Sequence, residues 1–169
     1  MTEHQYSFRY LRFASASELP EDEQKLLEQA FEASKNAYAP YSGFNVGAAV
    51  ALADGTCWTG NNQENGAYPS GLCAERTALF TIGSAGKATL IRKIAVRAFS
   101  NQFTLDTPAG PCGACRQVML EYEKISNSEW VILLQGESGD ILKIQGVASQ
   151  LLPFSFDLNQ LSENSSSIE

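Results

Sequence analysis

Residues 71–78 read GLCAERTA and residues 111–117 read PCGACRQ, and the rest of the chain is best interpreted around these two stretches. Together they contain three of the four cysteines in the sequence: Cys73, Cys112 and Cys115. They also contain one carboxylate, Glu75, two residues after the first of these thiols. Three thiolate ligands with a carboxylate beside them are the groups that a catalytic zinc ion with one open coordination position requires.

The spacing of the thiols also favours a shared metal. Cys112 and Cys115 are three residues apart, so both sulfur atoms lie on one face where a helix begins. Cys73 comes at the start of another predicted helix, where the positive end of the helix dipole lowers the pKa of a thiol. Arg76 and Arg116 each directly follow one of these motif elements, and both are predicted to offset the thiolate charge by hydrogen bonding.

Two alternatives remain open on spacing alone: no metal, or a closed structural zinc site in which Cys57 is the fourth ligand. Structural zinc sites usually take their ligands in close pairs, whereas a predicted strand and a loop separate Cys57 from Cys73. Cys57 also lies within that strand, where a buried free cysteine is common. The spacing therefore favours the catalytic site.

Composition limits the other functions that the chain can have. The 169 residues include 44% hydrophobic residues, which is sufficient for the core of one domain. The net charge of −7 and the absence of any Lys/Arg run disfavour binding to nucleic acid, so small molecules or further subunits are the expected partners. No apolar stretch approaches the roughly 20 residues of a membrane span, and the first residues lack a signal-peptide pattern. We therefore expect a cytoplasmic protein with reduced thiols.

Local patterns predict an α/β fold with a mixed sheet of about five strands. Aromatic alternation over 6–13 indicates either a short strand or a mobile arm, and Asp54-Gly55 indicates a hairpin turn. We expect a domain over 20–158, an N-terminal extension over 1–19 that supplies a possible extra strand, and a flexible tail over 159–169. The predicted strands cover 44–52, 56–61, 90–99, 130–135 and 141–144. The first predicted helix begins at Pro20 and ends before Pro40. Three further helices are predicted over 74–82, 113–124 and 147–152.

The sequence resembles the small, homotetrameric, zinc-dependent cytidine deaminases of pyrimidine salvage. The resemblance covers roughly residues 20–158 and rests first on the CAE and PCGAC motifs above. Five further groups of residues match in the same order as in that family: Tyr41–Phe44, Val46–Ala49, Asn62–Asn65, Arg76–Ala78 and Leu151–Phe156. It implies a three-layer α-β-α sandwich, and one zinc ion per chain held by Cys73, Cys112 and Cys115.

The same resemblance implies roles for the residues around the metal. Glu75 is expected to carry protons while zinc-bound hydroxide attacks C4 of cytosine, and Arg76 to moderate the thiolate charge. The expected substrate contacts are Phe44 with the base, Asn62 and Glu64 with the ribose hydroxyls, and the backbone of Ala74 with the base edge. Neighbouring subunits are expected to contribute Gly66, Tyr68 and Phe156.

The expected reaction is hydrolytic deamination of cytidine and 2′-deoxycytidine to uridine and 2′-deoxyuridine. One alternative substrate is a cytosine-containing antibiotic nucleoside, and another is cytosine within RNA or DNA. A zinc-stabilised interaction module without catalysis is an alternative of a different class. That alternative requires Cys57 to close the metal site.

Overall fold

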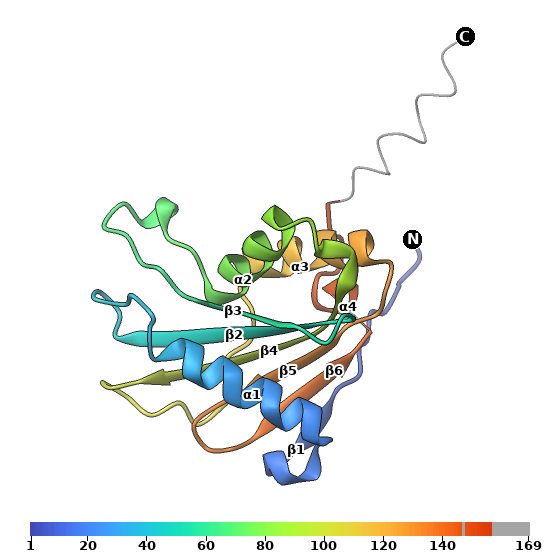
Figure 1. Ribbon diagram of the computed structural model, residues 1–169. Helices are drawn as coiled ribbons and strands as arrows, with labels where there is room; N and C mark the ends of the chain where they lie inside the picture. The colour runs from blue at the N-terminus through green and yellow to red at the C-terminus, as the bar shows by residue number, and fades with distance from the viewer. Residues whose placement is uncertain (147, 157–169) are drawn as a thin grey trace.

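The computed structural model, which describes residues 1–146 and 148–156, contains a six-stranded sheet with helices on both faces (Figure 1). The spatial order of the strands is β1-β6-β5-β4-β2-β3, and β4 and β5 form the one parallel pair among them. The strands are β1 (Leu11–Phe13), β2 (Phe44–Leu52), β3 (Cys57–Asn61), β4 (Ile91–Ser100), β5 (Val131–Gln135) and β6 (Ile141–Gln145). Five of the six begin and end within one residue of the predicted ranges.

The helices form the outer layers. They are α1 (Glu21–Ser34), α2 (Ala74–Ser84), α3 (Gly113–Ser126) and the short α4 (Ala148–Leu151), with single 3-10 turns at Ala16–Glu18, Tyr68–Ser70 and Ala88–Leu90. On one face α1 buries Leu26, Leu27 and Ala30 against the sheet. On the opposite face α2 and α3 pack Leu79, Ile82 and Met119 against it (Figure 1). The predicted three-layer α-β-α sandwich is thus confirmed.

The sixth strand comes from the N-terminal extension. β1 pairs antiparallel with β6, with Leu11 opposite Lys143, and so covers an edge that would otherwise expose unpaired backbone groups. Only the last three residues of the predicted 6–13 strand adopt this structure, because Tyr6, Phe8 and Tyr10 lie outside the core and are about half exposed. The tail predicted over 159–169 lies outside the described residues.

The first helix ends at Ser34, before Pro40 as predicted, and α3 ends at Ser126, two residues beyond its predicted end. The second was expected to end at Gly83, but α2 continues to Ser84. A Cβ atom at Gly83 would lie 2.2 Å from the Tyr122 hydroxyl, so close packing against α3 explains the glycine, rather than termination of the helix. None of the described helices is both long enough and apolar enough to cross a membrane.

Candidate active site

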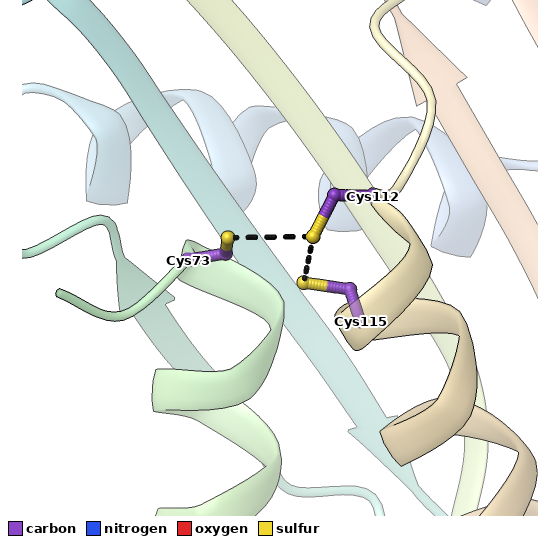
Figure 2. A group of neighbouring side chains, drawn as sticks. All are labelled: Cys73, Cys112 and Cys115. Carbon is purple, nitrogen blue, oxygen red and sulfur yellow. Dashed lines mark hydrogen bonds between the residues drawn. The ribbon is translucent and has the colours of Figure 1, made fainter. Parts of the chain in front are cut away.

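The three predicted thiol ligands meet between the beginnings of α2 and α3 (Figure 2). Their sulfur atoms all lie within 4.8 Å of one another. The Cys73 and Cys112 sulfurs are 3.7 Å apart, and those of Cys112 and Cys115 are 3.4 Å apart. Zinc–sulfur bonds of about 2.3 Å in a tetrahedral arrangement separate the sulfurs by about 3.8 Å. The cluster therefore fits one zinc ion, and three protein ligands are the number found in catalytic zinc sites.

Two helix N-termini point toward this cluster. Cys73 is the N-cap residue of α2 and Cys112 is that of α3, and neither helix has a side-chain cap. The free amide groups of the first turns place partial positive charge beside the sulfurs, which favours thiolates. Hydrogen bonding from Cys115, and next the guanidinium of Arg76, lowers the pKa of Cys73 to about 5. The same hydrogen bond, together with burial, raises the pKa of Cys115, so Cys73 is the thiol of this pair that loses its proton first.

The carboxylate of Glu75 lies in the first turn of α2 and is 5% exposed. Burial raises the pKa of this carboxyl group, because removal from water disfavours its charged form. Glu75 lines the same cavity as Cys73 and Cys112. A carboxyl group whose pKa is raised, placed beside a metal site, can both accept and release protons, which is the property that a general acid–base catalyst requires.

The two predicted charge-balancing arginines have different surroundings. Arg76 places one guanidinium nitrogen 3.7 Å from the Cys73 sulfur and 3.4 Å from the carbonyl oxygen of Gly71. Arg116 instead donates hydrogen bonds to the carbonyl oxygens of Pro111, at 2.8 Å, and Leu151, at 2.9 Å. The geometry supports charge balance by Arg76. The hydrogen bonds of Arg116 connect the start of α3 to α4, so its charge-balancing role stays a prediction.

Two of the three thiols, those of Cys73 and Cys112, line a cavity of about 550 Å³. Its walls come from the start of β2, the 62–72 loop after β3, the first turn of α2 and the 109–112 segment before α3. Residues with predicted functions that line it are Phe44, Asn62, Glu64, Tyr68, Cys73, Ala74, Glu75, Arg76 and Cys112. Segments far apart in the sequence thus converge on one cavity, with two of the three predicted metal ligands and the buried carboxyl group of Glu75 in its wall.

The model of a protein family described as the cytidine and deoxycytidylate deaminase zinc-binding region matches residues 20–131. The chain belongs to this family. It is 40% identical to a cytidine deaminase of Halalkalibacterium halodurans over 142 residues, which is 84% of this chain and 99% of that protein. It is also 40% identical to a cytidine deaminase of Sporosarcina psychrophila, over 83% of this chain and 96% of the relative.

Solved structures of cytidine deaminases agree in fold and in sequence. The crystal structure of the enzyme from Burkholderia pseudomallei has a TM-score of 0.67 and 39% identity, over 78% of this chain and 97% of that chain. The enzyme from Mycobacterium tuberculosis has a TM-score of 0.60 and 33% identity, over 81% and 98% of the two chains. The family's sandwich fold therefore extends over most of this chain.

Cys57 is not part of the thiol cluster. It lies on β3 and packs against the core beneath α1, on the opposite face of the sheet from α2 and α3. Burial raises the pKa of its thiol, which disfavours the thiolate. The described residues thus contradict the closed four-thiolate site, and with it the interaction module that needed Cys57 as a ligand.

Both residues assigned to the ribose also organise the cavity wall. The side-chain oxygen of Asn62 accepts a hydrogen bond from the backbone nitrogen of Val46, at 2.8 Å, and its amide nitrogen donates to the carbonyl of Phe44, at 2.9 Å. Glu64 accepts hydrogen bonds from the backbone nitrogens of Tyr41 and Ser42 and from the Ser42 hydroxyl. The Ser42 hydroxyl bond is the main cause that lowers the pKa of Glu64, so this group stays ionised.

The three residues assigned to neighbouring subunits have separate positions in this chain. Tyr68 lines the cavity of its own chain, while the residue is 78% exposed. Gly66 lies close to the Tyr41 ring, since a Cβ atom there would be 3.1 Å from the Tyr41 hydroxyl. Phe156 is 63% exposed, and its carbonyl oxygen accepts a hydrogen bond from Gln117. Their contribution to another subunit stays a prediction.

Tyr41 and Ser42 are among the cavity-wall residues to which sequence reasoning assigned no function. Both lie in the motif before β2 that helped to identify the family resemblance, so the signal was present without a role attached. The hydrogen bonds with Glu64 now supply that role: the two residues hold its carboxylate at the cavity wall.

Proposed function

We propose that this protein catalyses the hydrolytic deamination of cytidine and 2′-deoxycytidine, giving uridine or 2′-deoxyuridine and ammonia. The observation that carries the proposal is a cluster of three thiols, two of which line one cavity together with the buried carboxyl group of Glu75. The cavity volume of about 550 Å³ lies within the range of small-molecule sites. Membership of the family and the relatives named cytidine deaminase support this choice of substrate.

One zinc ion per chain would be held by Cys73, Cys112 and Cys115. When bound, zinc supplies a Lewis acid that lowers the pKa of water and so makes a nucleophile available at neutral pH. Glu75 moves the protons of the reaction. It takes one proton from the attacking water and delivers it to N3 of the cytosine ring, and it then passes the second proton of that water to the exocyclic amine. The C4–N4 bond then breaks and ammonia leaves.

The other cavity residues orient the nucleoside. The ring of Phe44 packs on the base, and the backbone of Ala74 reads its edge. Glu64 and Asn62 retain hydrogen-bonding capacity for the ribose hydroxyls beyond their internal bonds, because a carboxylate offers about four acceptor positions and an amide two acceptor and two donor positions. An ionised Glu64 also disfavours a nucleotide phosphate nearby, so free nucleosides are the expected substrates.

The proposed assembly is a homotetramer in the cytoplasm, in which Gly66, Tyr68 and Phe156 also contact a neighbouring subunit's substrate. The exposure of Tyr68 and Phe156 is compatible with this arrangement. The net charge of −7 disfavours a single-stranded nucleic acid as the substrate.

The test measures cytidine turnover as ammonia release, with zinc content determined for the wild type and for Glu75→Gln. We expect the variant to keep zinc and to lose about 10²- to 10⁴-fold in kcat, because glutamine has the same shape but carries no transferable proton. Glu121→Gln, on the exposed surface of α3, is the matched control and should stay fully active. A wild type that binds zinc yet leaves cytidine unchanged would overturn the substrate; antibiotic nucleosides and single-stranded cytosine would then be assayed.

A further inference from the structure

A second aromatic ring lies against the ring that contacts the base. The rings of Phe44 and Phe103 are nearly parallel, with 16° between their planes and 6.2 Å between their centres. This is the offset stacked arrangement that aromatic pairs favour. Phe44 lines the cavity, whereas Phe103 is not among the lining residues and is 50% exposed. Phe103 therefore contacts Phe44 from outside the cavity.

The segment that carries Phe103 is held by hydrogen bonds on both sides of this residue. The carboxylate of Glu137, in the turn between β5 and β6, accepts hydrogen bonds from the backbone nitrogens of Ser100, at 3.2 Å, and Leu105, at 2.9 Å. The Glu137 backbone nitrogen also donates to the carbonyl of Leu105, at 3.2 Å. These bonds flank Phe103 and fix the backbone around it.

The segment also packs directly against the turn that precedes Phe44. Gly43 has a φ of +62°, and a Cβ atom there would lie 2.6 Å from the side-chain nitrogen of Gln102. Farther along, the same segment contributes Ala109 and Gly110 to the cavity wall before it reaches the ligand Cys112. One stretch of backbone thus joins the Phe103 ring to the part of the cavity wall that holds Cys112.

We infer that Phe103 is a positioning residue, whose ring holds the Phe44 ring in place against the substrate base. This inference rests on the proposed function for the identity of the substrate. Truncation of Phe103 frees the Phe44 ring to adopt other rotamers, and binding of the base must then order it again. Because that cost applies equally to the bound substrate and to the transition state, it raises KM and leaves kcat nearly unchanged.

The experiment compares steady-state cytidine deamination by Phe103→Ala, Phe103→Tyr and the wild type. Because a stacked aromatic partner is lost, KM should rise about 2- to 10-fold in Phe103→Ala. Phe103→Tyr retains the ring and should restore the wild-type KM. The matched control is Phe8→Ala: Phe8 is 49% exposed and pairs with Tyr10 at 6.0 Å between ring centres, but it lies on the N-terminal extension. This control should leave both constants unchanged.

A readout that needs no turnover separates this inference from the proposed function. In protein with ¹³C-labelled phenylalanine, the Phe44 ring signal can be identified as the one lost in Phe44→Leu. It should shift in Phe103→Ala but not in Phe8→Ala. A wild type inactive on cytidine overturns the proposed function alone, and the Phe44 signal then decides the role of Phe103. An unmoved Phe44 signal, or an unchanged KM in an active Phe103→Ala enzyme, refutes that role.

Discussion

Gly60 is expected to control the metal site without contacting it. It lies on β3 beneath the first turns of α2, and a Cβ atom there would be 2.5 Å from the Ala78 nitrogen and 2.7 Å from the Ala74 carbonyl oxygen. These are backbone atoms of the helix that begins next to Cys73. Ordinary contacts begin near 3.4 Å, so Gly60→Ala requires α2 and β3 to separate by about 0.7–0.9 Å.

That displacement is large for a metal site. Zinc–ligand distances vary by only about 0.2 Å in functional sites, so a shift of Cys73 relative to α3 should weaken zinc binding. A misplacement of about 1 Å at the reacting centre costs about 100-fold in rate. Forcing an extra methyl group into a packed interface costs about 1–3 kcal/mol of unfolding free energy. We therefore expect Gly60→Ala to fold with reduced stability, reduced zinc content and about 100-fold lower kcat/KM.

Gly47→Ala supplies the matched control on the other face of the sheet. A Cβ atom at Gly47 would lie 1.9 Å from the Ala30 carbonyl oxygen and 2.5 Å from the Ser34 nitrogen, so it displaces α1, which carries none of the proposed site residues. This variant should lose at least as much stability in urea unfolding but keep kcat/KM per bound zinc within a few-fold of wild type. The reasoning is refuted if Gly60→Ala keeps full zinc and activity, or if Gly47→Ala loses zinc to the same extent.

Two further predictions concern the metal directly. Cys57→Ser should keep the wild-type zinc content and change the unfolding free energy by about 1 kcal/mol or less, whereas Cys73→Ser should lose zinc; metal analysis of both proteins checks this. In free zinc at 1,000 times its Kd, the unfolding free energy should be about 4 kcal/mol higher than after a chelator has removed the zinc. Scanning calorimetry should show this as a Tm lower by about 2–4 °C per kcal/mol, and a Tm unaffected by the chelator would contradict a metal bound to the folded state.

Local signals in the sequence were sufficient for most elements. Asp54-Gly55 directs a hairpin because the Asp54 carboxylate accepts hydrogen bonds from the backbone nitrogen and the hydroxyl of Thr56, while Gly55 adopts a φ of +82°. The N-terminal alternation was less informative. The period of two in 6–13 indicates an extended chain but not which residues find a partner strand, and only Leu11–Phe13 lie opposite β6.

The metal ligands could be predicted from the sequence, whereas the hydrogen bonds within the cavity wall could not. Thiols have few other uses at such spacing, so Cys73, Cys112 and Cys115 could be grouped before their positions were known. The internal bonds of Asn62 and Glu64 depend on tertiary contacts with the start of β2 and the turn before it, some 20 residues earlier, and local patterns carry no signal for such pairs. The contact between the Phe103 and Phe44 rings could not be predicted for the same reason.

The topology explains why ligands 39 residues apart in sequence meet at one point. β4 and β5 are parallel, so the chain must return across a face of the sheet between them, and α3 provides that crossover. α3 returns on the face that α2 already covers, which places two helix N-termini side by side above the sheet (Figure 1). An antiparallel connection from β4 would need only a short turn and would supply no second helix. The one parallel pair among the described strands is therefore the feature that completes the three-thiol site.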